Sequence, residues 1–590
     1  MALTASNPAR SFASILAAGL ALAASGAVGA FGAATDSSAL PEQVTYSEHV
    51  APIFFEHCAS CHRPHDVAPM SLVSYEAARP WAKSIAKAVA DRAMPPWDAD
   101  PRHGDFSNDI SLDEREIAMV RRWVELGAPE GDRAKLPPLP ELPAPGSWKM
   151  GRQPDYTIEL AEVAVPSGGP DLFVTQVFGS DVPDGKWIQA IELLPGNTDV
   201  LHHVVTYLGP FGISDEDDVS NQGITKTIFL NEASKRDIGM AEAPRIGGVW
   251  VAGSPPSVFP TGHGQSLAAN ELFSFNMHYH PSGNAGTDRS KLGIYFGEGE
   301  LVKEVTTAFA VDPGLWIPAG VSDHREDAVY LFARDSLITS LLPHMHNRGK
   351  SMKYTLVRPD GAEQVLLDVP EYDYNWQNIY RFREPVVAPA GSIVRVEAHW
   401  DNSAANPGNP DPTQDVPWGD GTNSEMLVGF IDYIDATETR PRPAPAGPQL
   451  ERLLGLHGAA DSYLVTVDGM GFGSQWGLVV PLDEGAPGEL YMVMGKLVIS
   501  TTVKDVERVG DEMLVNAAII TGGGGAVMPL GFLVRRSEDG TALAGEVFFG
   551  RVLTADTLDS MRGQGRSITG ESLSARMLRQ ESSAGGAGAR

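Results

Sequence analysis

The chain contains almost no cysteine. Among its 590 residues there are only two, Cys58 and Cys61. An exported protein of this size that relied on disulfides would need many more, so a disulfide framework is excluded. The pair stands in the sequence Cys-Ala-Ser-Cys-His, which ends at His62, and it requires a different explanation.

Basic residues are also scarce. The chain has 45 Lys and Arg against 75 Asp and Glu, which gives a net charge of −30. This balance argues against nucleic acid and anionic membrane surfaces as partners, because both are negatively charged. The apolar fraction of 43% is ordinary for globular proteins, so we expect a sizeable core divided among about three or four domains.

Long hydrophobic runs are missing except near the N-terminus. There, Arg10 precedes the apolar run 15–24, and small residues with Ala-x-Ala-like sites follow. The run is too short to span a bilayer comfortably, so we predict a cleaved signal peptide and a periplasmic or secreted mature protein. An uncleaved anchor is the alternative. No later stretch has the pattern of a transmembrane helix, so we expect no membrane span after cleavage.

The region that follows has the pattern of a small helical domain. Ser47 is predicted to cap a helix with an apolar face, and a capping box at Ser111–Glu114 is predicted to open a later helix that Gly127 ends. The Cys-Ala-Ser-Cys-His motif lies between them. This order is that of a small cytochrome c, so we predict an all-α domain over residues 40–133.

The chemistry of the motif is specific. Its two thiols form thioethers to haem vinyl groups, and the adjacent imidazole binds the iron. We therefore predict one covalently bound haem c on Cys58, Cys61 and His62; a disulfide or a chance match is the alternative. Met94, followed by two prolines, is predicted as the sixth iron ligand, with core packing as its alternative role. Other candidates for this position are Met70, His49, His57, His65 and His103.

From about residue 156 the pattern changes to β. Short apolar or alternating runs are separated by Gly, Pro, Asn and Asp, and no long helical pattern interrupts them. This spacing predicts antiparallel sandwiches. A similar pattern over 462–553, without histidine or cysteine, predicts an accessory β domain that carries no site chemistry.

Two Pro-rich stretches and a small polar tail divide the chain further. The predicted fold class is multidomain, with a small all-α domain, two all-β sandwich domains and a C-terminal β-rich domain. The predicted parts are a signal peptide (1–34), a cytochrome c-like domain (40–133), a linker (134–150), two β domains (151–310 and 311–440), a second linker (441–450), an accessory β-rich domain (451–565) and a flexible tail (566–590).

Histidines occur in pairs in the first β region. His344 and His346 are two residues apart on an expected strand, so both point to one face and can share a metal ion. His278 and His280 share a face in the same way, so either or both are candidate ligands. We predict structural roles for the histidines that have no partner at metal spacing: His263, His324, His399 and His457.

The third pair, His202 and His203, is adjacent in sequence. Neighbours on a regular strand face opposite sides, so both can bind one ion only if the strand is twisted or bulged, or if one uses a different ring nitrogen. Met426 is a further candidate, since thioether sulfur favours Cu(I) and zinc sites seldom use methionine. Histidines with a methionine therefore point to copper; the alternative for Met426 is an ordinary core residue.

The order of these motifs (His-His, Met-His-Tyr, His-x-His, Glu-Met) resembles the copper type II, ascorbate-dependent monooxygenases. This family contains peptidylglycine α-hydroxylating monooxygenase and dopamine β-hydroxylase, and several bacterial members carry a fused cytochrome c. The resemblance covers residues 180–435 and implies two jelly-roll-like β domains, each with one copper ion. It implies these ligands: His202, His203 and His278 for the electron-transfer copper, and His344, His346 and Met426 for the catalytic, oxygen-binding copper.

The chain departs from the family at residues that bind a peptide carboxylate. Leu342 stands where the peptide-hydroxylating enzyme has Arg, and Val428 and Phe430 stand where it has Asn and Tyr. The resemblance therefore implies a more apolar substrate than a glycine-extended peptide. His280 has no counterpart and is either a spare ligand or a group that supports the ligands.

The expected function is that of an exported copper- and haem-containing monooxygenase. It would hydroxylate a C–H bond of a fairly apolar small molecule with O2, while an ascorbate-like reductant or a periplasmic redox protein supplies electrons and the haem relays them. The alternatives are a non-oxygenating haem–copper electron carrier and a copper-binding protein.

Overall fold

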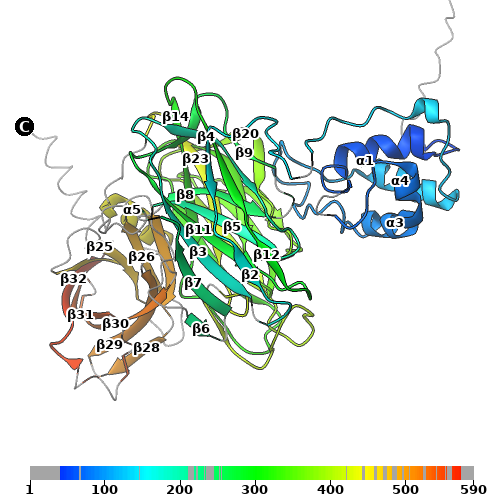
Figure 1. Cartoon of the computed structure of the whole chain (residues 1–590). Helices are drawn as coiled ribbons and strands as arrows, with labels where there is room; N and C mark the ends of the chain where they lie inside the picture. The colour runs from blue at the N-terminus through cyan, green and yellow to red at the C-terminus, as the bar shows by residue number, and fades with distance from the viewer. Residues whose placement is uncertain are drawn as a thin grey trace, which may run out of the picture. The chain divides into compact units, whose positions relative to one another are not determined.

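The computed structural model describes residues 40–572 except 65–67, 145, 170, 210–217, 221–222, 232, 234–244, 252, 254, 420, 441–445, 458–461, 469–474, 481–487, 495–496, 504, 510, 522–525, 540, 550, 552, 555–557 and 559–560. The predicted signal peptide and residues 573–590 lie outside this range. From Gln43 onward the chain belongs to one compact unit. Strands arranged in several sheets dominate it (Figure 1), in agreement with the β-rich prediction. No helix in the described part combines the length and apolar character needed to cross a bilayer.

Short helices precede the strands, and they bury a group of aromatic rings. Trp123 packs against Tyr46 and Phe54, with ring centroids 6.1 and 6.2 Å apart. The predicted capping box is displaced by two residues, because Asp113 caps the last long helix and pairs with Glu116. Ser47 is not an N-cap; it is buried inside the first turn. The helical elements are η1 Tyr46–Val50, α1 Ala51–His57, α2 Tyr75–Ala78, η2 Arg79–Trp81, α3 Ala82–Ala90, α4 Glu114–Glu125 and η3 Arg133–Lys135.

Two sheets share one core in the first part of the β region. One has the order β6-β7-β3-β11-β5-β8, and the other contains β1, β13, β4 and β10. Alternating apolar residues of both meet inside, among them Phe275 of β11 and Ile294 of β13. The strands are β1 Tyr156–Glu159, β2 Val163–Val165, β3 Leu172–Gly179, β4 Trp187–Leu194, β5 Leu201–Leu208, β6 Asp218–Ser220, β7 Gly223–Phe229, β8 Arg245–Val251, β9 Ser257–Val258, β10 His263–Ser266, β11 Leu272–Tyr279, β12 Gly286–Asp288 and β13 Lys291–Phe296.

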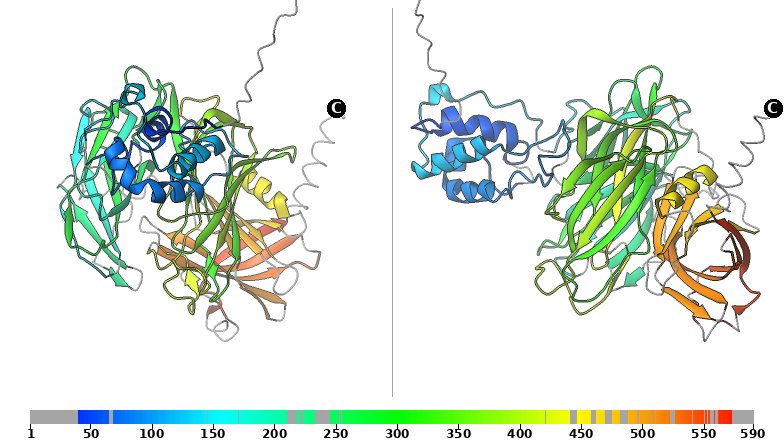
Figure 2. Two further views of the ribbon diagram at one scale, coloured as in Figure 1. Left: turned by 90° about the vertical axis from the view of Figure 1, so that its right-hand side faces the viewer. Right: turned by 180° about the vertical axis from the view of Figure 1, so that it is seen from behind.

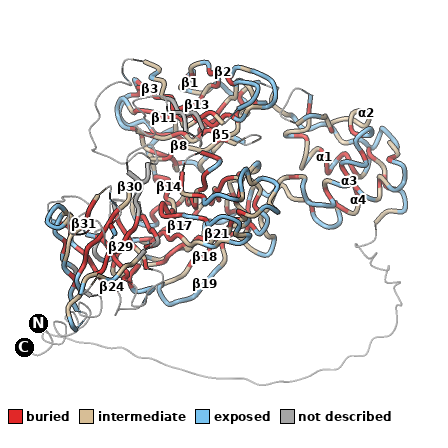
Figure 3. The backbone as a smooth tube through the Cα atoms, turned by 90° about the horizontal axis from the view of Figure 1, so that it is seen from below, coloured by how far each residue is buried: buried red, intermediate tan, exposed pale blue. Residues whose placement is uncertain are grey.

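The second part of the β region repeats this arrangement. A sheet of order β16-β21-β18-β19 shares a core with strands β14, β23, β17 and β20, and Figure 3 shows buried positions along both. Parallel pairing of β10 with β14 joins the two parts into one nine-stranded sheet. The strands are β14 Lys303–Val311, β15 Trp316–Ile317, β16 His324–Leu331, β17 Ser336–His344, β18 Gly349–Val357, β19 Glu363–Val369, β20 Tyr380–Ala388, β21 Ile393–Trp400, β22 Val416–Pro417 and β23 Val428–Asp435.

The predicted division between residues 310 and 311 is misplaced. It cuts through β14, which pairs with β23 over residues 305–311 and so belongs with the second part. The first linker is also shorter than predicted. Trp148 is buried, and the backbone N–H groups of Lys149 and Met150 donate to the Glu192 carboxylate of β4. Residues 148–150 therefore pack against the first β part.

The C-terminal part is a strongly curved antiparallel sheet (Figure 2), with the order β27-β26-β25-β24-β32-β31-β30-β29-β28. Strand β32 lies within the predicted tail and pairs with β24 and β31, so a tail beginning at residue 566 is wrong. Helix α5 begins inside the predicted second linker and buries Leu450 and Leu453. The elements are α5 Ala446–Leu454, η5 Gly455–His457, β24 Ser462–Val467, β25 Gln475–Val479, β26 Gly488–Met494, β27 Leu497–Val503, β28 Asp505–Val509, β29 Glu512–Thr521, β30 Ala526–Arg536, β31 Ala542–Phe549 and β32 Arg566–Ser572.

Candidate metal centre

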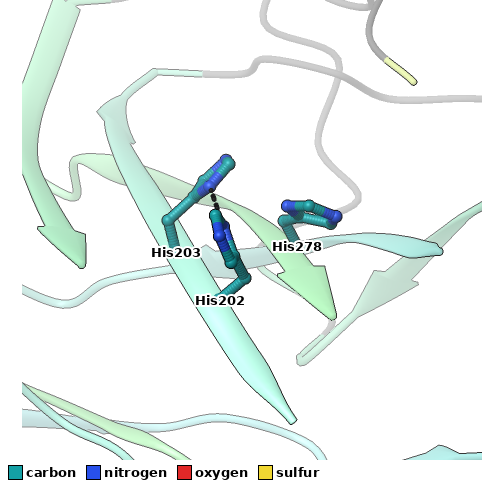
Figure 4. Close-up of side chains that lie close together, drawn as sticks. All are labelled: His202, His203 and His278. Carbon is teal, nitrogen blue, oxygen red and sulfur yellow. Dashed lines mark hydrogen bonds between the residues drawn. The ribbon is translucent and has the colours of Figure 1, made fainter. Parts of the chain in front are cut away.

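A β-bulge brings His202, His203 and His278 together. Strand β11 pairs with β5 so that His278 lies opposite His203, but the next residue, Tyr279, pairs with Leu201. His202 is therefore the extra residue of a bulge, which turns its ring toward that of His203. One ring nitrogen of each histidine lies within 4.8 Å of the others, and the Nδ1 atoms of His202 and His203 are 3.0 Å apart (Figure 4).

These three imidazoles form a buried set of electron-pair donors. Burial lowers the pKa of all three, to about 3 for His202, so the rings are neutral at pH 7. His202 Nε2 is buried and has no hydrogen-bond partner among the described residues. Neutral imidazoles whose ring nitrogens converge, with a polar atom left unsatisfied, fit a site for a metal that prefers nitrogen.

Asp171 fixes one of these rings from behind. Its carboxylate lies 2.9 Å from His278 Nε2 and 2.8 Å from His280 Nδ1, and it accepts a hydrogen bond of 2.6 Å from Thr422. Burial raises the pKa of Asp171, but the hydrogen bonds from the two histidines outweigh this effect and hold it below its usual range. An acceptor at Nε2 leaves the lone pair on Nδ1 of His278, as carboxylate–histidine pairs do at metal sites.

His280 is therefore not one of the three histidines whose ring nitrogens converge; it contacts Asp171, which in turn contacts His278. Its side chain is 67% exposed and contacts Asp171. Asp171 itself was not predicted. It stands singly before β3, at no recognisable spacing from the histidines, so only the pairing of β3 with β11 brings it to His278.

His344 and His346 lie at the end of β17 with ring centroids 5.2 Å apart. His344 Nδ1 is 2.7 Å from the Gln377 side-chain oxygen, and His346 Nδ1 is 3.0 Å from the backbone oxygen of Ser424. Because oxygen acceptors take both Nδ1–H groups, both Nε2 atoms carry lone pairs. Burial lowers the pKa of both rings, to about 4 for His344.

Met426 lies just before β23, the strand that pairs with the end of β17. His344 pairs with Val428 at the end of the β17–β23 ladder. His346 follows His344 by two residues, and Met426 precedes Val428 by two residues. The intervening residues, Met345 and Leu427, are fully buried in the core. Met426 is only partly buried and packs against the same core.

Glu425 holds the backbone at this point. Its buried carboxylate accepts hydrogen bonds from the backbone N–H groups of His346 at 2.8 Å and Arg348 at 2.6 Å, and from the Trp400 indole at 3.2 Å. Burial raises its pKa to about 7, against the opposing effect of these donors. The carboxylate thus ties the segment before Met426 to the His-x-His turn.

The two histidine sets are in contact. The rings of His203 and His344 have centroids 5.9 Å apart and are nearly perpendicular. Tyr374, from the loop between β19 and β20, stacks on His202 at 4.7 Å and lies edge-on to His346 at 6.2 Å. Neither Tyr374 nor Gln377 was predicted, although the aromatic, amide-rich run 372–380 would have been a signal that this loop has a packed role.

Apolar residues share a face of the β17–β23 pair with His344. Leu342 pairs with Phe430, and His344 pairs with Val428 two residues further along β17. Because side chains two residues apart on a strand point the same way, all four share one face of the β17–β23 pair. The Phe430 ring lies 6.3 Å from that of His344. The positions where the family has Arg, Asn and Tyr therefore present apolar surface near His344.

The Cys-Ala-Ser-Cys-His motif follows helix α1. His62 Nδ1 lies 3.1 Å from the backbone oxygen of Met70, which orients the ring and leaves Nε2 as the ligand atom. Both cysteines are free thiols, and burial raises the pKa of Cys58 to about 12. Free, neighbouring thiols beside an oriented imidazole fit covalent haem attachment.

Met94 follows helix α3 and is half-buried. The alternative ligands have other contacts. His49 accepts the Thr45 backbone N–H, His57 contacts Ile110 O and Glu116, and His103 lies in a cluster with Asp100 and Asp368. His65 lies outside the described residues.

The segment after Met94 contacts the loop that carries Tyr374 and Gln377. The Asn378 side chain donates to Pro96 O at 2.9 Å, and Trp97 packs on Tyr380 with centroids 4.7 Å apart. Cys61 Sγ packs against Gly253, 3.4 Å from the position that a Cβ atom on this glycine would occupy. Gly253 lies two residues after Val251, which is the strand partner of His203. The predicted haem region therefore contacts segments next to both histidine sets.

The histidines predicted to be structural have ordinary partners. His263 contacts Thr261 O, and His457 lies 2.6 Å from the Tyr491 hydroxyl. His324 and His399 face carboxylates. The Asp100, His103 and Asp368 cluster is less suited to a metal than the buried histidines, because Arg102 and Lys353 already neutralise its carboxylates.

Comparison with known proteins adds little to this geometry. No family model matches the chain, and no curated protein matches it. Among solved structures, the major capsid protein P2 from bacteriophage PM2 is 13% identical, covers 48% of this chain and 97% of its own, and has a TM-score of 0.21. The infectious bursal disease virus Gx strain structure is 11% identical, covers 48% and 73%, and has a TM-score of 0.14. Neither likeness is close enough to carry an argument.

Proposed function

We propose that this protein is an exported copper-dependent monooxygenase that hydroxylates a small, fairly apolar molecule with O2 and receives electrons through a covalently bound haem c. The observation that carries the proposal is the convergence of five neutral histidines, from three separated stretches, into two adjacent donor sets. We assign residues 40–133 to a cytochrome c-like domain and the two β parts to jelly-roll-like domains on the family resemblance.

The donor atoms indicate which metal each set would hold. Nitrogen donors of His202, His203 and His278 suit a copper ion that passes electrons. His344 and His346, together with the thioether of Met426 that the family resemblance implies as a ligand, would suit copper that cycles through Cu(I). Bound copper supplies one-electron redox chemistry and the activation of O2.

The protein's own residues orient these groups and shape the space around them. Asp171, Gln377 and the Ser424 carbonyl hold one ring nitrogen each of His278, His344 and His346, so these three imidazoles present a fixed lone pair. Phe430 and Leu342 share a face of the strand pair with His344 and would provide apolar contact for a substrate there. Without a cationic side chain at position 342, a charged carboxylate has no partner there.

Contacts of the N-terminal region support an electron relay. Asn378 binds the backbone two residues after Met94, and its neighbour Gln377 binds His344. Cys61 lies beside Gly253, and Gly253 is two residues after Val251, the strand partner of His203. These contacts link the segment after Met94 and Cys61 to residues next to the histidine sets, as an electron relay would require.

The test is incubation of the copper- and haem-loaded protein with ¹⁸O2, a reductant and a panel of apolar substrates. Hydroxylated product that carries one ¹⁸O atom is expected. Unlabelled product with both sets loaded would contradict oxygen insertion from O2.

The contact between the two sets favours a second candidate, a non-oxygenating haem–copper electron carrier. The rings of His203 and His344 contact each other, and Tyr374 contacts the rings of His202 and His346, which suits electron exchange between the two sets. Oxygen uptake by the reduced protein discriminates the two functions: uptake that depends on substrate supports the monooxygenase, and its absence across the panel supports the carrier.

A further inference from the structure

The loop of residues 370–379, between β19 and β20, is attached to the His-x-His segment at two points. The Tyr372 hydroxyl donates to the backbone oxygen of Met345 at 2.9 Å and accepts the N–H of the same residue at 3.0 Å. Gln377 accepts a hydrogen bond from His344 Nδ1 at 2.7 Å and donates to Tyr374 O at 3.3 Å. The loop is thus held over His344 and His346 by side chains on either side of Tyr374.

From this position Tyr374 reaches the other histidine set. Its ring stacks on His202 with a centroid distance of 4.7 Å and an interplanar angle of 15°. Its hydroxyl is 3.2 Å from His278 Nδ1. The stack fixes the ring plane of His202. His202 is the bulged residue, so regular strand geometry does not determine its orientation.

We propose that Tyr374 is a positioning residue of the His202, His203 and His278 set, so that this site is completed by a side chain from the second β part. The proposal rests on the metal-binding function proposed above. It follows that metal binding at this set restricts the loop of residues 370–379, which also contacts His344 through Gln377 and Pro96 through Asn378. The stacked ring, rather than the hydroxyl, carries the effect, because it contacts the bulged ligand.

The first experiment measures Cu⁺ affinity of the full-length chain by competition with a coloured chelator. The background variant His346→Ala removes a ligand from the second set, so that the titration reports the three-histidine set. Tyr374→Leu should weaken binding about 10–100-fold, the usual cost of losing a group that orients a metal ligand. Tyr374→Phe keeps the stack and should stay within about threefold of the parent.

The matched control is Asn375→Ala. This neighbour is exposed and its side chain bonds to Asp373 within the loop, so its replacement should leave Cu⁺ affinity unchanged. Thermal unfolding of each variant without metal establishes that the fold persists. Unchanged affinity in Tyr374→Leu overturns the proposal, as does a loss in Tyr374→Phe equal to that in Tyr374→Leu, which would assign the effect to the hydroxyl.

The second experiment follows backbone hydrogen exchange in residues 370–379, a readout that does not depend on activity. Adding Cu⁺ to the background variant should slow exchange in this loop, and the slowing should disappear in Tyr374→Leu. Slowing that persists in Tyr374→Leu contradicts the proposed role. If the background variant binds no Cu⁺, the proposed function fails together with this inference; if it binds Cu⁺ with no response to Tyr374, only the inference fails.

Discussion

The imidazole rings of His203 and His344 lie edge to face with centroids 5.9 Å apart. They come from different strands, β5 and β17, and from the two histidine sets that the family resemblance assigns to separate copper ions. The two sets are therefore neighbours within the same buried region, so we expect substitutions in one set to change metal binding at the other.

Replacement of Met426 is the sharpest test of the proposed catalytic copper site, which consists of His344, His346 and Met426. Met426→Ile removes the thioether and keeps an apolar side chain of similar size, so we expect at least about a 100-fold loss of substrate hydroxylation. Copper at the three-histidine set should remain, as measured by metal analysis. Met528→Ile, at a partly buried methionine in the C-terminal sheet, is the matched control. Full activity in Met426→Ile would show that the catalytic ligand is misassigned.

Asp171 should matter for metal binding although it is not a predicted ligand. Asp171→Asn replaces the carboxylate that accepts from His278 and His280, so we expect about 10–100-fold weaker copper binding at the three-histidine set. Competition titration measures the effect. Asp181→Asn, an exposed aspartate bonded to Tyr156, should bind copper like the parent, and an equal loss there would indicate a general effect of charge.

The haem assignment predicts a covalent attachment that depends on both thiols. Changing Cys58 and Cys61 together to Ala should abolish haem that survives denaturation, because no thioether can form. Absorption spectra and the mass of the denatured chain measure this. Copper content should be unaffected, since the histidine sets do not include these residues; covalent haem in the double variant would refute the assignment.

Electron transfer between haem and copper should depend on Asn378. Asn378→Ala removes the hydrogen bond to Pro96 O and so lengthens the route to His344. We expect slower reoxidation of reduced haem by oxidised copper in rapid-mixing experiments, with unchanged copper content. Asn375→Ala in the same loop serves as control. Equal rates in all three proteins would exclude this route.

Asp98 makes the stability of the chain depend on pH. Burial, together with Asp373 and Glu371, raises the pKa of Asp98 to about 7. This value lies above that of the unfolded chain, so the folded state binds more protons between about pH 4 and 7, and the free energy of unfolding should fall as pH rises through this window.

Asp98→Asn should remove this dependence. Because the carboxyl is partly solvated, we expect a gain of only about 1–2 kcal/mol in the free energy of unfolding at pH 8 and little change at pH 4. Urea unfolding at the two pH values measures the difference. A variant that is equally affected at both would rule out titration of Asp98 as the cause.

Local patterns were sufficient for the features whose residues are adjacent in sequence. The change to β pattern after about residue 156 is one such feature, and β1 begins at Tyr156. The Cys-Ala-Ser-Cys-His motif and the His344-x-His346 pair are also local. In both, short spacing alone determines which groups share a side of the backbone.

The errors in the prediction are long-range. The placement of β14 with β23, and of β32 between β24 and β31, depends on hydrogen bonding to strands far away in sequence. A run of apolar residues predicts that a strand forms, but not which neighbour it pairs with. The boundaries at 310 and 565 were therefore misplaced.

The sequence by itself determined which chemical groups are available: thiols beside an imidazole, and histidines with a methionine in a particular order. Only the tertiary structure decided how they meet. The bulge at His202, the carboxylate of Asp171 behind His278 and the ring of Tyr374 on His202 all require packing between distant strands and loops. Single polar residues in loops carry no periodic signal, and their role arises from the surfaces that the folded sheets bring into contact.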